Sequence, residues 1–492
     1  MTSDIVFVTG ETYFDHPLCG VAILKRLLEK YGYKVKILEK PTKETIKNNK
    51  PNLFFAVTSG SVDSMLKNYT PLKKERDKDI PDRATIVYCN WIRQYHKNTP
   101  MAIGGIEPSM RRFVHYDYWD NNLRKPILFD SRADILAYGT AEKQILEIAN
   151  RLKNNQGLTD IPGTCIISRE LPEKFIELPS FQEVTNSHER FCDMQNMLTN
   201  DNLAQKIDNR YVLQYQAPQY TTDDLDEYYE LPFKREVNSK ELSGFEFSIV
   251  THRGCIGNCN FCAINLLQGD KIISRSKASI SREIKKITKM PHFKGNIDNI
   301  GGPSANMYGM DCNKCTGNCI DCNSLDRTNK EFIQLLKEAQ QIPGVKKVYI
   351  RSGVRYDLAS SEFIKQLALH HTSGKVRIAP EHVNEKVLEL MNKNKGNFHD
   401  FIREFRKHNK KDEISFYFMT AHPGSSMKEA KKLADELKQL KNTEDVQVFT
   451  PTPMTVSTCM YYTSLNPKTK EKIYIPYTYR EKKEQKRILF KS

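Results

Sequence analysis

Long apolar runs are missing from this chain. A membrane-spanning helix needs about 18–20 mostly apolar residues, and no stretch approaches that length. The first apolar run, Ile5–Val8, is too short for the core of a signal peptide and has no basic leader before it. We therefore expect a cytoplasmic protein with no membrane-spanning segment.

Extremes of composition are missing too. Apolar residues make up 39 % of the 492 residues and charged residues 27 %, which argues against a disordered or fibrous chain and predicts two or three globular domains. The formal charge is +15, and the basic residues are spread along the chain and become denser only after Pro467. A Lys-rich solvated surface is therefore the favoured interpretation, with nucleic-acid binding as the alternative.

A disulfide framework is not expected, because the cytosol keeps thiols reduced. Five of the twelve cysteines are scattered, which is typical of small buried apolar residues. The other seven lie between Cys255 and Cys322. Such clustering needs another explanation, and metal binding is the one we consider below.

The first 153 residues alternate short apolar runs with helical patterns, which predicts parallel strands in a doubly wound α/β domain. Its ligand side would be the carboxyl ends of the strands. Residues 154–243 lose this periodicity and are expected to form a connecting region with local structure. The expected strands are 5–9, 34–38, 53–57, 86–88, 101–103 and 135–137, with helices at 21–30 and 141–152.

Residues 244–465 show a second alternation of strands and helices. About six βα units in succession predict a full or partial (β/α) barrel, with its site on the loops at the carboxyl ends of the strands. Residues 466–492 carry nine Lys or Arg against three Glu and are expected to be a basic, solvated tail. Its tyrosines, Tyr474, Tyr477 and Tyr479, would either stack on bases or cover a helix or strand face.

The first barrel strand is followed by Cys255, Cys259 and Cys262, in a Cys-x3-Cys-x2-Cys spacing. Thiolates are the usual ligands of iron–sulfur clusters, and three of them can hold three irons of a 4Fe–4S cube. The fourth iron would be open, as in catalytic metal sites. Structural zinc is a poorer explanation, because it normally takes four protein ligands.

This spacing after the first strand of a (β/α) barrel resembles the radical S-adenosylmethionine (radical-SAM) signature, including the aromatic Phe261 before the last cysteine. Further segments, from about Asp4 to the tail, resemble the YgiQ family of radical-SAM proteins. These segments are Thr12–Pro17, Ser64–Met65, Ile103–Ser109, His115–Trp119, Ser274–Ser276, Gly301–Tyr308, Ser352–Leu358, Ala379–His382 and Pro451–Thr455.

The resemblance implies a 4Fe–4S cluster whose open iron chelates S-adenosylmethionine, and an electron donor such as a flavodoxin or ferredoxin. One-electron reduction would give methionine and a 5′-deoxyadenosyl radical that abstracts hydrogen from a substrate. The resemblance does not name that substrate.

By analogy with radical-SAM barrels, Gly301 and Gly302 at the end of the second strand would meet the methionine amino group through their backbone, a close approach that glycine permits. Pro303 stands where an acidic residue is usual. Ser352 and Arg355, after the third strand, would reach ribose or carboxylate. The alternative for this pair is a turn and a surface ion pair.

A second cysteine group has the spacing Cys-x2-Cys-x3-Cys-x2-Cys. Four thiolates within eleven residues predict either a closed tetrahedral zinc site or a second iron–sulfur cluster. Both metals remain open. The residues are Cys312, Cys315, Cys319 and Cys322.

A doubly wound domain before the barrel is also the arrangement of cobalamin-dependent radical-SAM enzymes. Gly104 and Gly105 would fit the pocket for the dimethylbenzimidazole tail. The histidine loop of such domains reads Asp-x-His-x-x-Gly, whereas Asp15 and His16 are adjacent here and Gly20 follows four residues later. We therefore expect a cobalamin-like fold used for another purpose, with base-off cobalamin as the alternative.

The leading hypothesis is a radical-SAM enzyme acting on an unknown substrate. One alternative is an RNA-modifying methylthiotransferase-like enzyme, suggested by the second cysteine group, the basic charge and the loop-like His422-Pro423-Gly424. Another is a non-catalytic iron–sulfur protein for redox sensing or electron transfer. His382 and His422 are interpreted as ordinary loop histidines, with proton donation near the substrate as the alternative.

Overall fold

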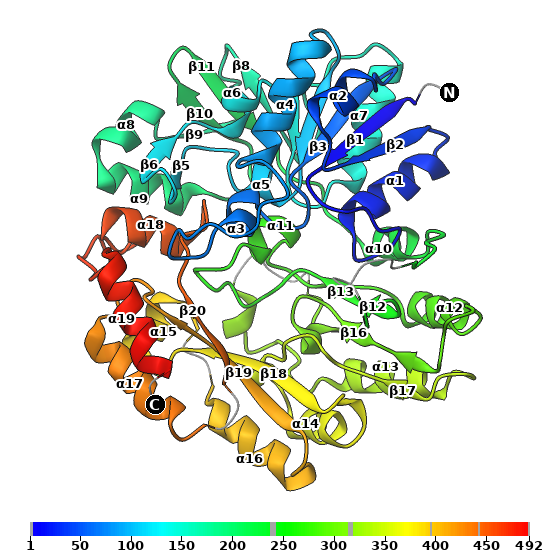
Figure 1. The fold of residues 1–492 in the computed structure, drawn as a ribbon, viewed down its shortest axis with the longest axis vertical. Coiled ribbons are helices and arrows are strands. Elements are labelled where there is room, and N and C mark those ends of the chain that lie inside the picture. The colour runs from blue at the N-terminus through cyan, green and yellow to red at the C-terminus, as the bar shows by residue number, and fades with distance from the viewer. Residues whose placement is uncertain (1–2, 237–242, 313–317, 394–395, 441–442, 491–492) are drawn as a thin grey trace.

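The computed structural model describes residues 3–236, 243–312, 318–393, 396–440 and 443–490 (Figure 1). An amino-terminal unit, blue to green in the figure, lies above a carboxy-terminal unit that runs from green to red. None of the helices in these ranges is long and apolar enough to cross a membrane.

A nine-stranded sheet forms the centre of the amino-terminal unit. Helices α1 (Gly20–Lys30) and α7 (Glu142–Lys153) pack on one of its faces, and α4 (Ala84–Tyr95) packs on the other. The predicted doubly wound α/β domain is therefore confirmed. Its parallel strands stand in the order β2 (Val35–Glu39), β1 (Ile5–Thr9), β3 (Phe54–Thr58), β4 (Met101–Gly104) and β7 (Ile135–Ala137).

The sheet does not end with β7. Residues 154–243, expected to be a connecting region, extend it by four strands, with antiparallel pairing from β7 through β8 and β11 to β10. Gln205 and Gln214 hide the alternation, because they occupy buried strand positions and bond to the Val114 backbone and to Arg112. The added strands are β8 (Thr164–Ser168), β11 (Arg210–Gln214), β10 (Leu203–Ile207) and β9 (Ile176–Leu178).

Residues 86–88, predicted as a strand from two β-branched residues, lie inside helix α4, so this prediction is wrong. Short apolar runs do not distinguish a strand from a buried helix segment. The buried positions of α4 recur at helical spacing: Ala84, Thr85, Tyr88, Cys89 and Ile92.

Six parallel strands form the carboxy-terminal unit, which is an open barrel: within the described ranges no pairing joins the last strand to the first. The Ile300 N–H donates to the Tyr349 carbonyl (3.0 Å), and Val354 bridges Ile378, which links the shorter ladders. The predicted fold class is confirmed. The strands are β12 (Ser248–Val250), β15–β16 (Asn296–Ile297 and Asn299–Gly301), β17 (Lys347–Val348), β18 (Lys375–Glu381), β19 (Glu413–Thr420) and β20 (Thr443–Val448).

Amphipathic helices cover the outside of this barrel and bury isoleucine, leucine and phenylalanine side chains against its strands. They are α12 (Lys277–Ile287), α13 (Lys330–Gln341), α14 (Ser361–Gln366), α16 (Phe398–His408) and α17 (Met427–Leu437).

The carboxy-terminal segment is folded rather than solvated. Helix α19 (Tyr479–Phe490) packs against α17 (Figure 1). Its buried Gln485 accepts hydrogen bonds from the Thr420 hydroxyl (2.9 Å) and the Ala421 N–H (3.0 Å), at the end of β19. The expectation of a solvated tail is therefore corrected. The Gln485 amide bonds to the end of β19, and α19 packs against helix α17.

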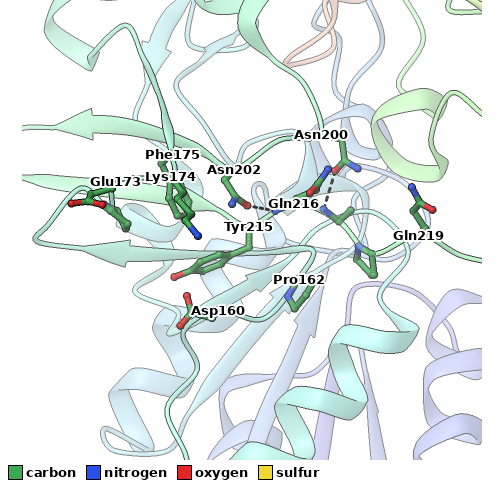
Figure 2. A pocket seen from close by; sticks show the side chains of 13 residues that line it. Asp160, Pro162, Glu173, Lys174, Phe175, Asn200, Asn202, Tyr215, Gln216 and Gln219 are labelled. Atoms are coloured by element: carbon green, nitrogen blue, oxygen red, sulfur yellow. Dashed lines mark hydrogen bonds between the residues drawn. The ribbon is translucent and has the colours of Figure 1, made fainter. Parts of the chain in front are cut away.

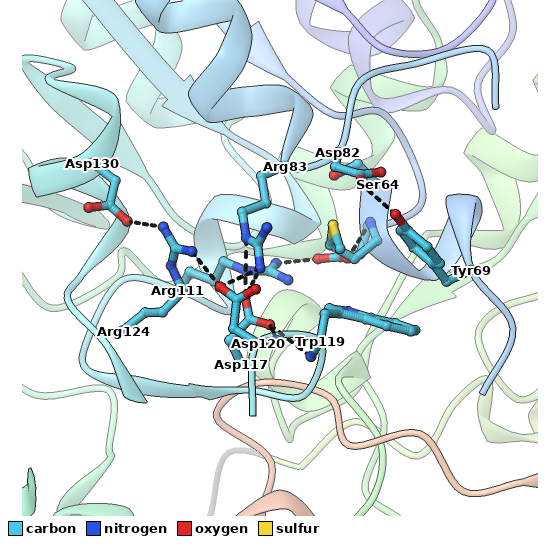
Figure 3. Close-up of polar contacts among 12 residues, drawn as sticks. Ser64, Tyr69, Asp82, Arg83, Arg111, Asp117, Trp119, Asp120, Arg124 and Asp130 are labelled. Carbon is cyan, nitrogen blue, oxygen red and sulfur yellow. Dashed lines mark hydrogen bonds and ion pairs between the residues drawn. The ribbon is translucent and has the colours of Figure 1, made fainter. Parts of the chain in front are cut away.

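Ion pairs to the buried carboxylates Asp63 and Asp117 hold the chain that follows β4 (Figure 3). Arg111 pairs with Asp63, and Arg83 pairs with Asp117 at 2.9 Å. Asp117 ends strand β5 (His115–Asp117), which forms a hairpin with β6 (Asn122–Arg124). Asp117 belongs to His115–Trp119, one of the segments that resemble the YgiQ family. Its ion pair therefore helps to fix the β5–β6 hairpin.

Candidate active site

The cysteine loop begins at the carboxyl face of the barrel, where β12 ends. Two short strands, β13 (His252–Arg253) and β14 (Ile273–Ser274), pair in antiparallel fashion beyond it. The predicted triplet lies in the loop between them, and none of its thiols is in a disulfide. The position matches the expected one, after the first barrel strand.

The three thiols lie close enough to influence one another electrostatically. Burial raises the pKa of Cys262 to about 12, and Cys259 and Cys255 act in the same direction. Burial also raises the pKa of Cys255, which the nearby Arg355 opposes. The Ile264 N–H donates to Cys262 Sγ (3.5 Å), so the loop already offers a donor to a thiolate there.

Arg355 lies against this loop. Its Nη1 is 3.5 Å from Cys259 Sγ, and its other nitrogens form a bidentate pair with Asp357 at 2.8 and 2.5 Å. Gly257 permits the close approach, because a Cβ there would collide with the guanidinium. The buried Arg355 is thus neither in a surface ion pair nor on the cavity described below.

The donor set fits an iron–sulfur cluster. Cluster thiolates carry negative charge, and Arg355, whose other nitrogens pair with Asp357, directs Nη1 toward Cys259 Sγ. In the part of the chain that the structure describes, no three His, Cys, Asp or Glu side chains are close enough to share one metal ion. Thiolates of a cube ligate different irons and need not converge on one point.

An ion pair ties the cysteine loop to the amino-terminal unit. Arg253 Nη2 lies 2.7 Å from Glu142 Oε1, and Arg253 Nε donates to the Tyr229 hydroxyl at 3.0 Å. All of these groups are buried. Removing one partner of such a pair would leave an uncompensated charge, which costs about 3–5 kcal/mol.

A cavity of about 530 Å³ lies between the two units. The carboxyl ends of β3, β4 and β7 form one wall, and the carboxyl ends of β12 and β16, with Ser352 beyond β17, form the other. Gly301, Gly302 and Ser352, all predicted to bind the cofactor, line it, as do Gly104 and Gly105. Ser352 Oγ accepts a hydrogen bond from Asn299 (2.9 Å), a further lining residue.

Gly302 has a specific steric role at this cavity. A Cβ on it would lie 2.5 Å from His252 Nε2. That nitrogen donates to the Ser304 carbonyl (3.1 Å), while Nδ1 lies 2.9 Å from the Thr251 hydroxyl. Burial lowers the pKa of His252 to about 4, so the ring is neutral and fixed.

Two residues at the end of β18 carry buried polar atoms without a partner in the described part of the chain: Glu381 Oε2 and His382 Nε2. Glu381 also has a left-handed backbone (φ 69°), which is strained for this side chain. Burial raises the pKa of Glu381 to about 7 and lowers that of His382 to about 4. The sequence did not single out Glu381, although this residue lies in Ala379–His382, one of the segments that resemble the YgiQ family.

His422 has full hydrogen bonding. Its Nε2 lies 2.7 Å from the Ser457 hydroxyl, and its Nδ1 lies 2.9 Å from the Pro423 carbonyl. Burial lowers its pKa to about 3. The geometry is that of an ordinary satisfied loop histidine.

The second cysteine group lies beside the first. Cys319 packs in the same apolar cluster as Cys255, with Cys322 at its margin. Lys271 Nζ is 3.1 Å from Cys319 Sγ. Cys312 is partly buried, and Cys315 lies outside the described residues.

His16 does not line the cavity. Its Nε2 lies 2.9 Å from the Glu246 carbonyl, and its Nδ1 accepts from the Leu18 N–H at 3.1 Å. Both ring nitrogens are therefore engaged, and burial lowers the pKa to about 4. As placed, His16 offers no nitrogen to a metal.

A recess of about 800 Å³ lies elsewhere on the amino-terminal unit (Figure 2). Asn202 accepts from the Gln216 N–H (2.8 Å), and Asn200 accepts from the Ala217 N–H (3.0 Å). These amides hold a loop, and none of the cysteines that the structure describes lines this recess.

Comparison with known proteins agrees with this architecture. Residues 1–245 match the family described as "Radical SAM N-terminal", 249–437 match the Radical SAM superfamily, and 444–491 match a domain of unknown function, DUF3362. The UPF0313 protein MJ1155 of Methanocaldococcus jannaschii is 43 % identical, covering 99 % of this chain and 89 % of the relative. A UPF0313 protein of Clostridium botulinum is 40 % identical, covering 99 % and 85 %.

Two solved structures share the fold at low sequence identity. One is TsrM of Kitasatospora setae, a radical S-adenosylmethionine methyltransferase with cobalamin and a [4Fe-4S] cluster bound (TM-score 0.59, 14 % identity, covering 94 % of this chain and 76 % of that one). The other is OxsB, a cobalamin-dependent S-adenosylmethionine radical enzyme (TM-score 0.54, 12 % identity, 100 % and 56 %).

The barrel, its cysteine loop and the sheet before it define a radical-SAM protein of the two-unit type. Within that class, the chain belongs to the UPF0313 (YgiQ) family. The predicted family resemblance is confirmed.

Gly302→Ala tests the steric role of Gly302. The added Cβ would overlap the His252 ring, and overpacking of this kind costs about 1–3 kcal/mol. We expect a lower free energy of unfolding in urea. Gly353→Ala is the matched control, because a Cβ there meets no atom within 4 Å; equal losses in both variants would contradict the assignment.

Proposed function

We propose that this protein is a radical-SAM enzyme that reductively cleaves S-adenosylmethionine and directs the radical to a substrate of unknown identity. The observation that carries the proposal is the triplet Cys255, Cys259 and Cys262 at the carboxyl end of the first strand of a (β/α) barrel, beside Arg355. Membership of the Radical SAM superfamily and the enzymes among the structural neighbours support it.

The three cysteines would hold a 4Fe–4S cluster, which supplies electrons to cleave S-adenosylmethionine once that molecule is bound. Arg355 offsets the negative charge of the thiolates. Gly301 and Gly302 present backbone at the cavity wall, and Ser352 presents a hydroxyl. Closure of the cavity by the two units would exclude water from the reacting groups.

Glu381 and His382 are the groups that we propose to contact substrate or the sugar of the cofactor. Each has a buried polar atom that lacks a partner within the described ranges, and leaving such a group unpaired costs about 1–3 kcal/mol. A bound molecule with hydroxyl or amino groups would satisfy both. With a pKa of about 7, Glu381 can bind as the acid or as the carboxylate.

The test is formation of 5′-deoxyadenosine by anaerobically reconstituted protein with dithionite and S-adenosylmethionine. We expect product from the wild type and only background from Cys255→Ala, Cys259→Ala and Cys262→Ala. Cys165→Ala, a buried cysteine in β8 away from the loop, is the control and should keep activity. No product from the wild type would favour a non-catalytic iron–sulfur protein.

We further propose that Cys312, Cys315, Cys319 and Cys322 hold a second metal site, either zinc or a second iron–sulfur cluster. Cys312→Ser and Cys319→Ser should lower the bound zinc, or bound iron beyond the first cluster, relative to Cys165→Ser. Total iron and zinc by plasma mass spectrometry checks this, and unchanged contents would refute it. Retained 5′-deoxyadenosine formation would show that the first cluster is intact.

We propose that the cavity serves S-adenosylmethionine and substrate rather than cobalamin. The hydrogen bonds of His16 leave it no free nitrogen, and about 530 Å³ suits a drug-sized ligand rather than a corrin with its nucleotide tail. After incubation with hydroxocobalamin and desalting, the ultraviolet–visible spectrum should contain no corrinoid bands. Retained bands at one equivalent would overturn the proposal, with bovine serum albumin as the control for non-specific carry-over.

A further inference from the structure

A separate cavity of about 660 Å³ lies between the β5–β6 hairpin and the carboxy-terminal segment. Two lysines, Lys73 and Lys482, and six tyrosines account for most of its lining. Four of the lining tyrosines and Lys482 come from residues 461–482, within the domain of unknown function. None of the cysteine-loop residues lines this cavity.

Lys482 is a buried ammonium group with only phenol partners. Its side chain is 3 % exposed, and its Nζ donates to the hydroxyls of Tyr461 (2.7 Å) and Tyr118 (3.2 Å). No carboxylate forms an ion pair with it within the described ranges. A buried charge is costly unless it is paired, and the cation–π contacts with the same two rings (4.7 and 4.9 Å) offset only part of that cost.

Lys73 brings a second positive charge to the same place. Its Nζ lies 4.6 Å from the centre of the Tyr118 ring and donates to the Trp119 carbonyl at 3.3 Å. Asp117 and Asp120, the carboxylates whose charge acts on Lys73, are both already paired with Arg83. Within the described ranges, two ammonium groups thus line one cavity and neither has a carboxylate as an ion-pair partner.

The remaining walls are aromatic. Tyr116 stacks on Tyr462 (ring centres 5.0 Å, 30° between planes), and Tyr461 packs edge-on against Tyr477 (5.2 Å). Tyr477 and Tyr479 remain about half exposed at the mouth. The Tyr461 hydroxyl accepts from Lys482, so its own proton can be donated to an incoming anion.

We propose that this cavity binds a nucleotide, with the phosphate held by Lys73 and Lys482 and the base stacked on the tyrosines. A phosphate monoester carries about −1.5 to −2 charges near pH 7, which matches two ammonium groups better than a single carboxylate does. Bases stack on aromatic side chains with about 1–3 kcal/mol each. The volume lies within the roughly 300–1,000 Å³ of small-molecule sites.

The test is isothermal titration of the full-length protein with UMP, because an adenine nucleotide could also enter the S-adenosylmethionine site. We expect one saturable site, weakened about tenfold to a hundredfold by Lys482→Met, as for loss of a charge-assisted hydrogen bond. Lys432→Met, an exposed lysine on α17, should bind like the wild type. Uridine, which lacks the phosphate, should bind far more weakly.

The thermal stability of Lys482→Met distinguishes a binding role of Lys482 from a structural role. Lys482→Met removes an uncompensated buried charge, so its Tm should equal or exceed that of the wild type. A lower Tm together with unchanged UMP binding would overturn the proposal, as would equal binding of uridine and UMP. No saturable UMP binding by the wild type would overturn it as well.

The pH dependence gives a second, independent readout. Burial, together with the like charge of Lys73, lowers the pKa of Lys482 to about 8, while Glu481 opposes this and Tyr118 and Tyr461 stay protonated. UMP affinity should fall about tenfold per pH unit above 8 as the ammonium is lost. Lys482→Arg should lose less affinity than the wild type at pH 9–10, because guanidinium stays charged, and its remaining decline would come from Lys73, whose pKa burial also lowers; an identical decline in both would refute the role of Lys482.

A further titration distinguishes a free mononucleotide from the end of an RNA strand as the ligand. If the ligand is a free mononucleotide, the cavity residues account for all of its contacts, so UMP should bind at least as tightly as a short uridine oligonucleotide with a 5′-phosphate. Much tighter binding of the oligonucleotide would refute the free nucleotide as ligand and assign the cavity to the end of an RNA strand.

Discussion

The buried ion pair between Arg253 and Glu142 is the constraint on which the geometry of the active site depends. Arg253 opens the cysteine loop, and Glu142 begins α7 of the other unit. Since neither charge can be exposed or left alone at low cost, the loop is fixed relative to the first sheet. The carboxyl ends of two sets of parallel strands therefore face each other, and the intervening cavity takes its walls from both.

At that cavity, Gly302 packs on the neutral His252 and the wall is fixed. Glu381 and His382, at the end of β18, do not line the cavity but retain unpaired polar atoms in the described structure. The radical chemistry that we propose would need rigid positioning and exclusion of water. Arg355 contributes differently, through the charge beside the cysteines.

The local sequence pattern predicted the bounds of several strands and some of the residues that line the cavity. The bounds Ile5–Thr9 and Ile135–Ala137 were predicted to the residue, and Gly301, Gly302 and Ser352 do line the cavity. Glu381 and Lys482 could not be found this way, because burial without a partner depends on segments far apart in sequence. Strands β10 and β11 were missed since buried glutamines break their alternation, and residues 86–88 because β-branched residues also occur in buried helices.

Helix α19 bears on how the chain is made. Gln485 caps the end of β19 through Thr420 and Ala421, so this part of the barrel is completed only by residues synthesised well after the cysteine loop. The cysteine loop leaves the ribosome more than two hundred residues earlier. During that interval its thiols are held by an incomplete barrel, which makes the order of cluster insertion and carboxy-terminal docking a kinetic question for biogenesis.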